Sequence, residues 1–167
     1  MALDAQAAAP EESGATAGQL SGTGIGAGTM VLTLRGAVMV EDLRPGYKVI
    51  TRDSGTAVLK SLRCHHLHTA VFRLRPDALG EGRPEQETLL AAGQRILLRD
   101  WRAKALFGVA EALVPVEKLE DGDYITALPA QRTQVFDLVF DAPHIIYAGG
   151  LEMAATAPQA AAVAVAS

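Results

Sequence analysis

The stretch that decides the fold is VMVEDLRPGYKVIT, residues 38–51. An apolar strand end is followed by Glu41-Asp42-Leu43, which predicts one helical turn, and Pro45-Gly46 then closes the segment before an apolar strand over 47–51. The same plan returns as VPVEKLEDGDYITA, residues 114–127. Two copies of one strand–turn–strand unit indicate an internal pseudo-two-fold, and chance similarity of two such units is the alternative.

The rest of the chain also consists of short apolar segments separated by turn residues. One short helix is expected over 102–107, and no helix longer than about two turns is predicted. Many short strands at this spacing are typical of a compact all-β fold. The strands are expected over 30–34, 37–40, 47–51, 56–68, 71–74, 87–90, 96–98, 124–128, 135–140 and 144–148, and the apolar residues 151–153 follow the last of them.

The two ends of the chain differ in composition from this body. Residues 1–23 are rich in Ala, Gly, Ser and Thr and show no apolar periodicity, so they predict a disordered leader. Residues 154–167 are Ala-rich and have neither a polar face nor helix caps, which predicts a disordered tail. One β domain is therefore expected over 24–153.

Composition and net charge narrow the expected partners, bonding and location of the protein. The net charge is −4 over 167 residues, which disfavours nucleic acid as a partner, and no apolar run approaches the ~18 residues of a membrane-spanning helix. The single cysteine, Cys64, excludes an intrachain disulfide. The first residues lack the basic start of a secretory signal, so a cytoplasmic protein is expected, with leaderless export left open.

Four segments, taken in chain order, resemble the Hint superfamily of Hedgehog autoprocessing domains and inteins, in particular its bacterial stand-alone branch. The most specific is Val40 to Gly46, within GIGAGTMVLTLRGAVMVEDLRPGYKVITRDSGT, residues 24–56. The others are ETLLAAGQRILL at 87–98, VPVEKL at 114–119 and LVFDAPHIIYAGGLE at 138–152. The resemblance implies an all-β Hint-type fold of two related halves, with one or two short helical turns.

The resemblance also implies a self-processing chemistry whose reactive groups are missing here. Family members use Cys or Ser at the first position, a histidine on a middle loop with a hydroxyl three residues earlier, and, in inteins, a terminal Asn. The matching positions are Gly24, Gln94, Ala91 and Gly149, and the chain contains no Asn at all. We therefore expect a catalytically inactive module that binds or assembles with another protein.

Two alternatives stay open at this point. Ser21 or Thr23, assisted by His144, would serve as a displaced hydroxyl nucleophile for residual autoprocessing.

The second alternative is a metal-binding module. Cys64, His66 and His68 share one face of the predicted strand, and His65 points to the other face. The outer two groups lie ~13 Å apart along a strand, so zinc would need two of the three plus a ligand from elsewhere. The competing interpretation is a polar strand edge, and no other cofactor is expected.

Overall fold

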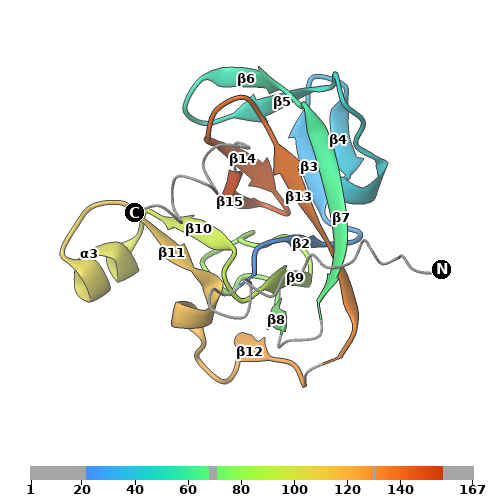
Figure 1. Cartoon of the computed structure of the whole chain (residues 1–167). Coiled ribbons are helices and arrows are strands. Elements are labelled where there is room, and N and C mark those ends of the chain that lie inside the picture. Colours follow the sequence, from blue (N-terminus) through green and yellow to red (C-terminus); the bar gives the residue numbers. More distant parts are fainter. Residues whose placement is uncertain (1–21, 68–70, 130, 156–167) are drawn as a thin grey trace, which may run out of the picture.

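The computed structural model describes residues 22–67, 71–129 and 131–155, which fold into two antiparallel sheets with one short helix (Figure 1). The all-β fold class is thereby confirmed. Within these residues, no helix has the length and apolar character needed to cross a membrane.

The larger sheet has eight strands, and it gathers segments from both ends of the domain. Its order is β11-β10-β15-β14-β3-β5-β6, with β4 paired to β3. The strands are β3 (Met30–Thr33), β4 (Gly36–Met39), β5 (Lys48–Thr51), β6 (Gly55–Val58), β10 (Arg95–Leu98), β11 (Ala112–Pro115), β14 (His144–Ala148) and β15 (Leu151–Ala155).

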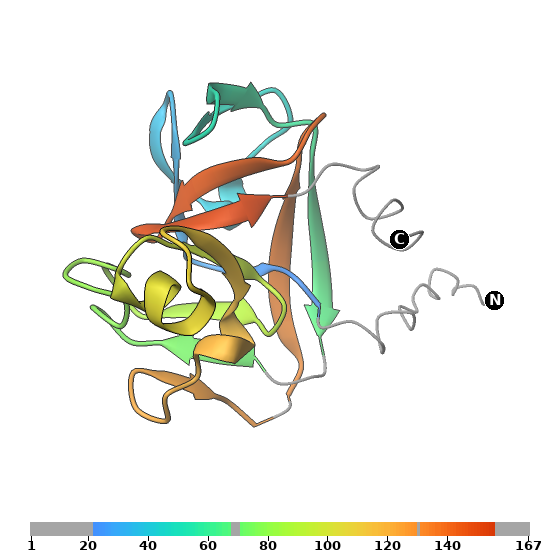
Figure 2. The same cartoon turned by 90° about the vertical axis from the view of Figure 1, so that its left-hand side faces the viewer.

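The smaller sheet has six strands in the order β12-β8-β9-β2-β13-β7. Its long β7–β13 pair runs up one side of the molecule and is clear in Figure 2. The strands are β2 (Ile25–Gly26), β7 (Ser61–Leu67), β8 (Val71–Leu74), β9 (Thr88–Ala91), β12 (Ile125–Ala127) and β13 (Thr133–Val139).

The apolar core follows the alternation of the strands. In β3, Val31 is fully buried while Met30 and Leu32 are exposed, as a strand with one covered face requires. Burial of these side chains is the main favourable term for folding. The largest fully buried side chains are Phe140, Leu59, Leu74, Leu90, Ile96, Leu98, Ile125, Ile146, Leu151, Met153, Val31 and Val40.

The repeated motif forms the same local unit twice. A 3-10 turn, η1 (Val40–Asp42), lies between β4 and β5, and η2 (Val116–Leu119) lies between β11 and β12. Each turn begins with a fully buried valine, Val40 or Val116. Both predicted helical turns are confirmed, and the two similar sequence segments, 38–51 and 114–127, adopt similar local structures.

The predicted helix is also present, as α3 (Trp101–Phe107). It begins where the Asp100 carboxylate accepts a hydrogen bond from the Arg102 N–H, and it ends at Gly108 in the left-handed conformation. The strand predicted over 56–68 is two strands, because the chain passes from the larger to the smaller sheet at Leu59-Lys60. Strands β2, β11 and β15 were not predicted, and β15 extends to Ala155, two residues into the expected tail.

Candidate functional site

Three of the four sequence-predicted site positions meet where the chain enters the smaller sheet. The Gly24 N–H donates to Gln94 Oε1 at 3.1 Å, and the Gly24 carbonyl accepts from the Ala91 N–H at 3.0 Å. Gly24 has φ +144°, a conformation that residues with a side chain rarely adopt. Both polar groups of this residue are therefore fixed by the loop that carries Gln94.

The space where a side chain at position 24 would lie is already occupied. A Cβ built on Gly24 lies 2.5 Å from Cγ2 and 2.7 Å from Cβ of Val135 on β13, closer than real Cβ contacts come. Val135 is fully buried, so a shift of its side chain would disturb a close-packed core. The position lacks a nucleophile, and it also lacks the room for one.

Gln94 is a buried amide with partners on both sides. Its exposed fraction is 3%, its Oε1 accepts from Gly24, and its Nε2 donates to the Ala154 carbonyl at 2.9 Å. A glutamine amide offers both an acceptor and a donor, so one side chain satisfies both contacts. Gln94 thereby connects the first residue of the domain to its last strand.

Gly149 does not belong to this junction. It lies in the turn between β14 and β15, where its N–H donates to the Met30 carbonyl and its nearest side chains are Thr29 and Thr88. The hairpin register pairs His144 with Ala155 at the opposite end, about 16 Å away at the rise of a strand. The residue of this hairpin that reaches Gln94 is Ala154, and nothing in the sequence marks it.

Thr23, one residue before Gly24, belongs to a polar cluster with Asp137 and His65 that the sequence did not predict. The Thr23 hydroxyl donates to Asp137 Oδ1 at 2.9 Å, and His65 Nε2 lies 2.9 Å from Asp137 Oδ2. The carbonyl of Gly22, which Thr23 follows, accepts from the Gly93 N–H at 2.7 Å. The only signal for the cluster was alternation on β7, which turned His65 away from Cys64.

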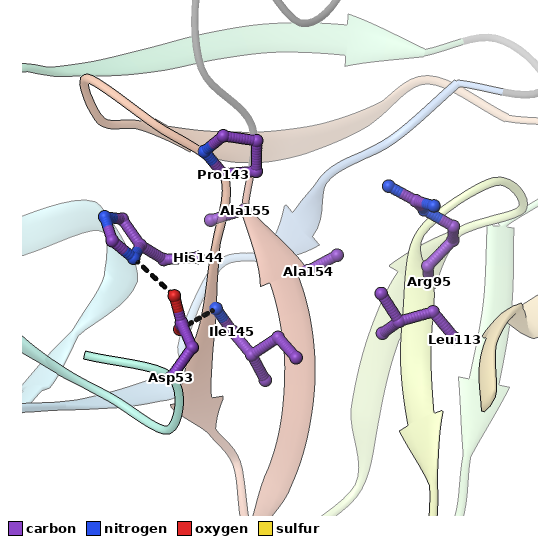
Figure 3. A pocket seen from close by; sticks show the side chains of 8 residues that line it. All are labelled: Asp53, Arg95, Leu113, Pro143, His144, Ile145, Ala154 and Ala155. Atoms are coloured by element: carbon purple, nitrogen blue, oxygen red, sulfur yellow. Dashed lines mark hydrogen bonds and ion pairs between the residues drawn. The ribbon is translucent and has the colours of Figure 1, made fainter. Parts of the chain in front are cut away.

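His144 forms a separate dyad at a surface pocket. Its Nδ1 lies 2.8 Å from Asp53 Oδ2, and the Ile145 N–H donates to Asp53 Oδ1 at 2.9 Å (Figure 3). Burial alone raises the pKa of the Asp53 carboxyl, but hydrogen bonds from Ile145 and His144 outweigh it and hold the pKa below its ordinary value. His144 therefore pairs with Asp53, and the histidine near Thr23 is His65.

Sequence comparison identifies the family to which this architecture belongs. A family model described as the Hint domain matches residues 24–160. The chain belongs to the Hint domain family. No curated protein sequence matches this Hint domain.

Solved structures show the same fold at low sequence identity. The intein-like domain from Clostridium thermocellum has a TM-score of 0.59 and 18% identity, covering 81% of this chain and 99% of that one. A DnaB intein from Synechocystis sp. PCC 6803 has a TM-score of 0.53 and 16% identity, covering 81% and 99%. The MchDnaB-1 intein has a TM-score of 0.53 and 13% identity, covering 79% and 99%. The suspected Hint resemblance is thus confirmed.

The predicted metal ligands of this Hint domain are only partly placed. Cys64 and His66 are exposed on β7, and the Gln134 amide donates to Cys64 Sγ at 2.9 Å. His68 and Ser21 lie outside the described residues. Within 22–67, 71–129 and 131–155, no three His, Cys, Asp or Glu side chains are grouped so as to hold a metal ion. Zinc binding at Cys64 and His66 stays a prediction.

Proposed function

We propose that this Hint domain does not carry out the acyl shift at position 24 and serves as a binding or assembly module for another protein. The observation that carries the proposal is the contact between Gly24 and Val135. An acyl shift needs a hydroxyl or thiol beside the preceding carbonyl. Val135 fills the volume in which that group would have to lie.

The surroundings of Gly24 support the same proposal. Gln94 takes the place that the family gives to a histidine, and an amide cannot transfer a proton near neutral pH. Its second hydrogen bond, to Ala154, holds the two ends of the domain together. A domain whose ends are tied in this way is suited to a rigid connecting role and poorly suited to releasing one of its ends.

Intact-mass spectrometry of the purified full-length chain tests this proposal. The protein is incubated at neutral pH for several days alone, with dithiothreitol, and with hydroxylamine. Dithiothreitol cleaves a thioester, and hydroxylamine cleaves a thioester or an ester. An unchanged mass under all three conditions is the expected result. Appearance of a fragment that starts at residue 24 would overturn it.

A second candidate function is favoured by the cluster around Thr23. Its hydroxyl would attack the Gly22 carbonyl carbon, passing its proton toward Asp137 and His65, while the Gly93 N–H stabilises the carbonyl oxygen. The bond from that carbon to the Thr23 nitrogen then breaks, leaving an ester and a free amine that takes up a proton. Water hydrolyses the ester and releases residues 1–22.

The same mass spectra decide between the two candidates. Cleavage between Gly22 and Thr23, accelerated by hydroxylamine and abolished in Thr23→Val and Asp137→Asn, would establish residual autoprocessing. Thr56→Ala removes an exposed hydroxyl elsewhere and serves as the matched control. An unchanged mass in the wild type sinks the second candidate and leaves the first.

A further inference from the structure

We infer that the pocket between Asp53 and Arg95 binds an extended peptide segment of a partner protein, with a basic side chain at one end, small apolar residues in the middle and an acidic side chain at the other end. This inference rests on the proposed binding function and names the kind of partner. It is argued from strand register, from the size of the side chains in the pocket floor, and from the charges at its two ends.

The floor of the pocket is a row of side chains that crosses three neighbouring strands. Ile145 on β14 pairs with Ala154 on β15, and the pairing of Ile96 with Met153 places Arg95 on β10 opposite Ala154. Paired residues of antiparallel strands point to the same face. The adjoining row of Ile96, Met153 and Ile146 is fully buried, so the Arg95 row faces outward.

The middle of this row is low because Ala154 carries only a methyl group. The larger side chains of Leu113 and Ile145 rise on either side, and Pro143 and Ala155 complete the rim (Figure 3). The resulting hollow has a volume of about 230 Å³, enough for two or three alanine- or valine-sized side chains and too small for a folded surface. Its lining is mostly apolar, which favours small apolar groups in the occupant.

The two ends of the hollow carry opposite charge. Arg95 is exposed, and its guanidinium has no hydrogen bond or ion pair to any residue that the structure describes. At the other end, the Asp53 carboxylate holds His144 and the Ile145 N–H. An acidic side chain would pair bidentately with Arg95, and a basic one would be attracted to Asp53.

The length of the row fixes the spacing of the two charges in the occupant. From Arg95 through Ala154 to Ile145 there are two strand-to-strand steps of about 5 Å each, and the Asp53 carboxylate lies 2.9 Å from the Ile145 nitrogen, which gives about 13 Å in total. In an extended peptide, residues four apart point to the same side and lie about 13 Å apart. The pattern that fits is therefore a basic residue and an acidic residue at positions i and i+4.

The inference is tested with the full chain and a synthetic probe, acetyl-Lys-Ala-Val-Ala-Glu-amide, titrated into 15N-labelled protein. Saturable shifts of the amide signals of Ile145 and Ala154 are expected. Arg95→Gln should weaken the binding at least tenfold, as should Ala154→Leu, which fills the hollow. Ala37→Leu, at an exposed alanine on β4, should leave the affinity unchanged and controls for added bulk.

Three results would overturn the inference: no saturable shift, equal binding by Ala154→Leu, or equal binding of a probe in which Lys and Glu are adjacent. The 15N spectrum of each variant shows whether it is folded. If Ala154→Leu fails to fold, Arg95→Gln, a substitution on the surface, still tests the inference in a folded protein. Intact mass is measured on the same samples. Cleavage would refute the proposed function separately, whatever the probe does.

Discussion

Substituting alanine for Gly24 tests the physical argument on which the proposed function depends. The new Cβ would lie 2.5 Å from Val135 Cγ2, and the backbone would have to keep φ +144°. Overpacking of a dense core costs about 1–3 kcal/mol, and a positive φ costs a residue with a Cβ about 1–2 kcal/mol. We expect Gly24→Ala to lower the free energy of unfolding by about 2–5 kcal/mol, a large share of a typical total.

Urea unfolding at pH 7 measures this loss, and a matched glycine separates its two parts. Gly28 also has a positive φ, +90°, but a Cβ built there meets no atom within 4 Å. Gly28→Ala therefore isolates the backbone cost, about 1–2 kcal/mol. The excess of Gly24→Ala over Gly28→Ala contains the cost of the contact with Val135 and the difference in backbone cost between φ +144° and φ +90°, which the double variant with Val135→Ala separates.

The double variant Gly24→Ala/Val135→Ala completes a thermodynamic cycle. Val135→Ala alone should cost about 2–3 kcal/mol, because it removes two fully buried methyl groups. The double variant should be more stable than the sum of the single effects by about 1–3 kcal/mol, because the new methyl then occupies the vacated space. The claim that Val135 closes the site would be refuted if the losses in the double variant were additive. It would also be refuted if Gly24→Ala lowered the free energy of unfolding no more than Gly28→Ala does.

Three further predictions concern charge and metal. Glu152→Gln should cost about 2–4 kcal/mol in urea unfolding, because this carboxylate is only 5% exposed and forms ion pairs with three arginines. Glu111→Gln, at a 50%-exposed carboxylate, should cost under about 1 kcal/mol, and equal losses in the two variants would contradict this reasoning. The lowered pKa of Asp53 contributes stability above its unfolded value of about 3.9 that is lost as pH falls through the folded value, so Asp53→Asn should flatten the acid limb of a stability–pH curve. Elemental analysis of untagged protein tests zinc: metal present in the wild type and absent in His66→Ala supports the site, and equal content in both refutes it.

The fold was predictable from the sequence where local turn chemistry determines it. The segment from Val38 to Thr51 carries a helical turn, a Pro-Gly closure and a strand within fourteen residues, and the structure has all three. Strand β2 was missed because its two residues, Ile25-Gly26, are too short to show a period. Strand β7 was joined to β6 because nothing local marks the passage of Leu59-Lys60 between sheets.

The site was predictable only where matching positions happen to be neighbours in space. Gly24, Ala91 and Gln94 meet because the loop after β9 binds the residue that precedes β2. The resemblance of residues 87–98 to the family already implied that loop. Asp137 was missed because its two partners are 72 and 114 residues away, and only sheet register connects them. Ala154 was also missed, because only sheet register brings it to Gln94 and because an alanine in an Ala-rich segment gives no signal of its own.

At the junction, the amide of Gln94 makes structural contacts in the position where the family resemblance implies a histidine. A glutamine amide cannot transfer a proton near neutral pH, but Oε1 and Nε2 of Gln94 bind backbone groups of Gly24 and Ala154 at the same time. Each hydrogen bond to a buried backbone group avoids a penalty of about 1–3 kcal/mol for leaving that group unpaired. The hydrogen bonds of Gln94, which connect the two ends of the domain, therefore stabilise the fold without any catalytic role. The proposed binding function requires only these fixed ends and the outward-facing pocket beside Ala154.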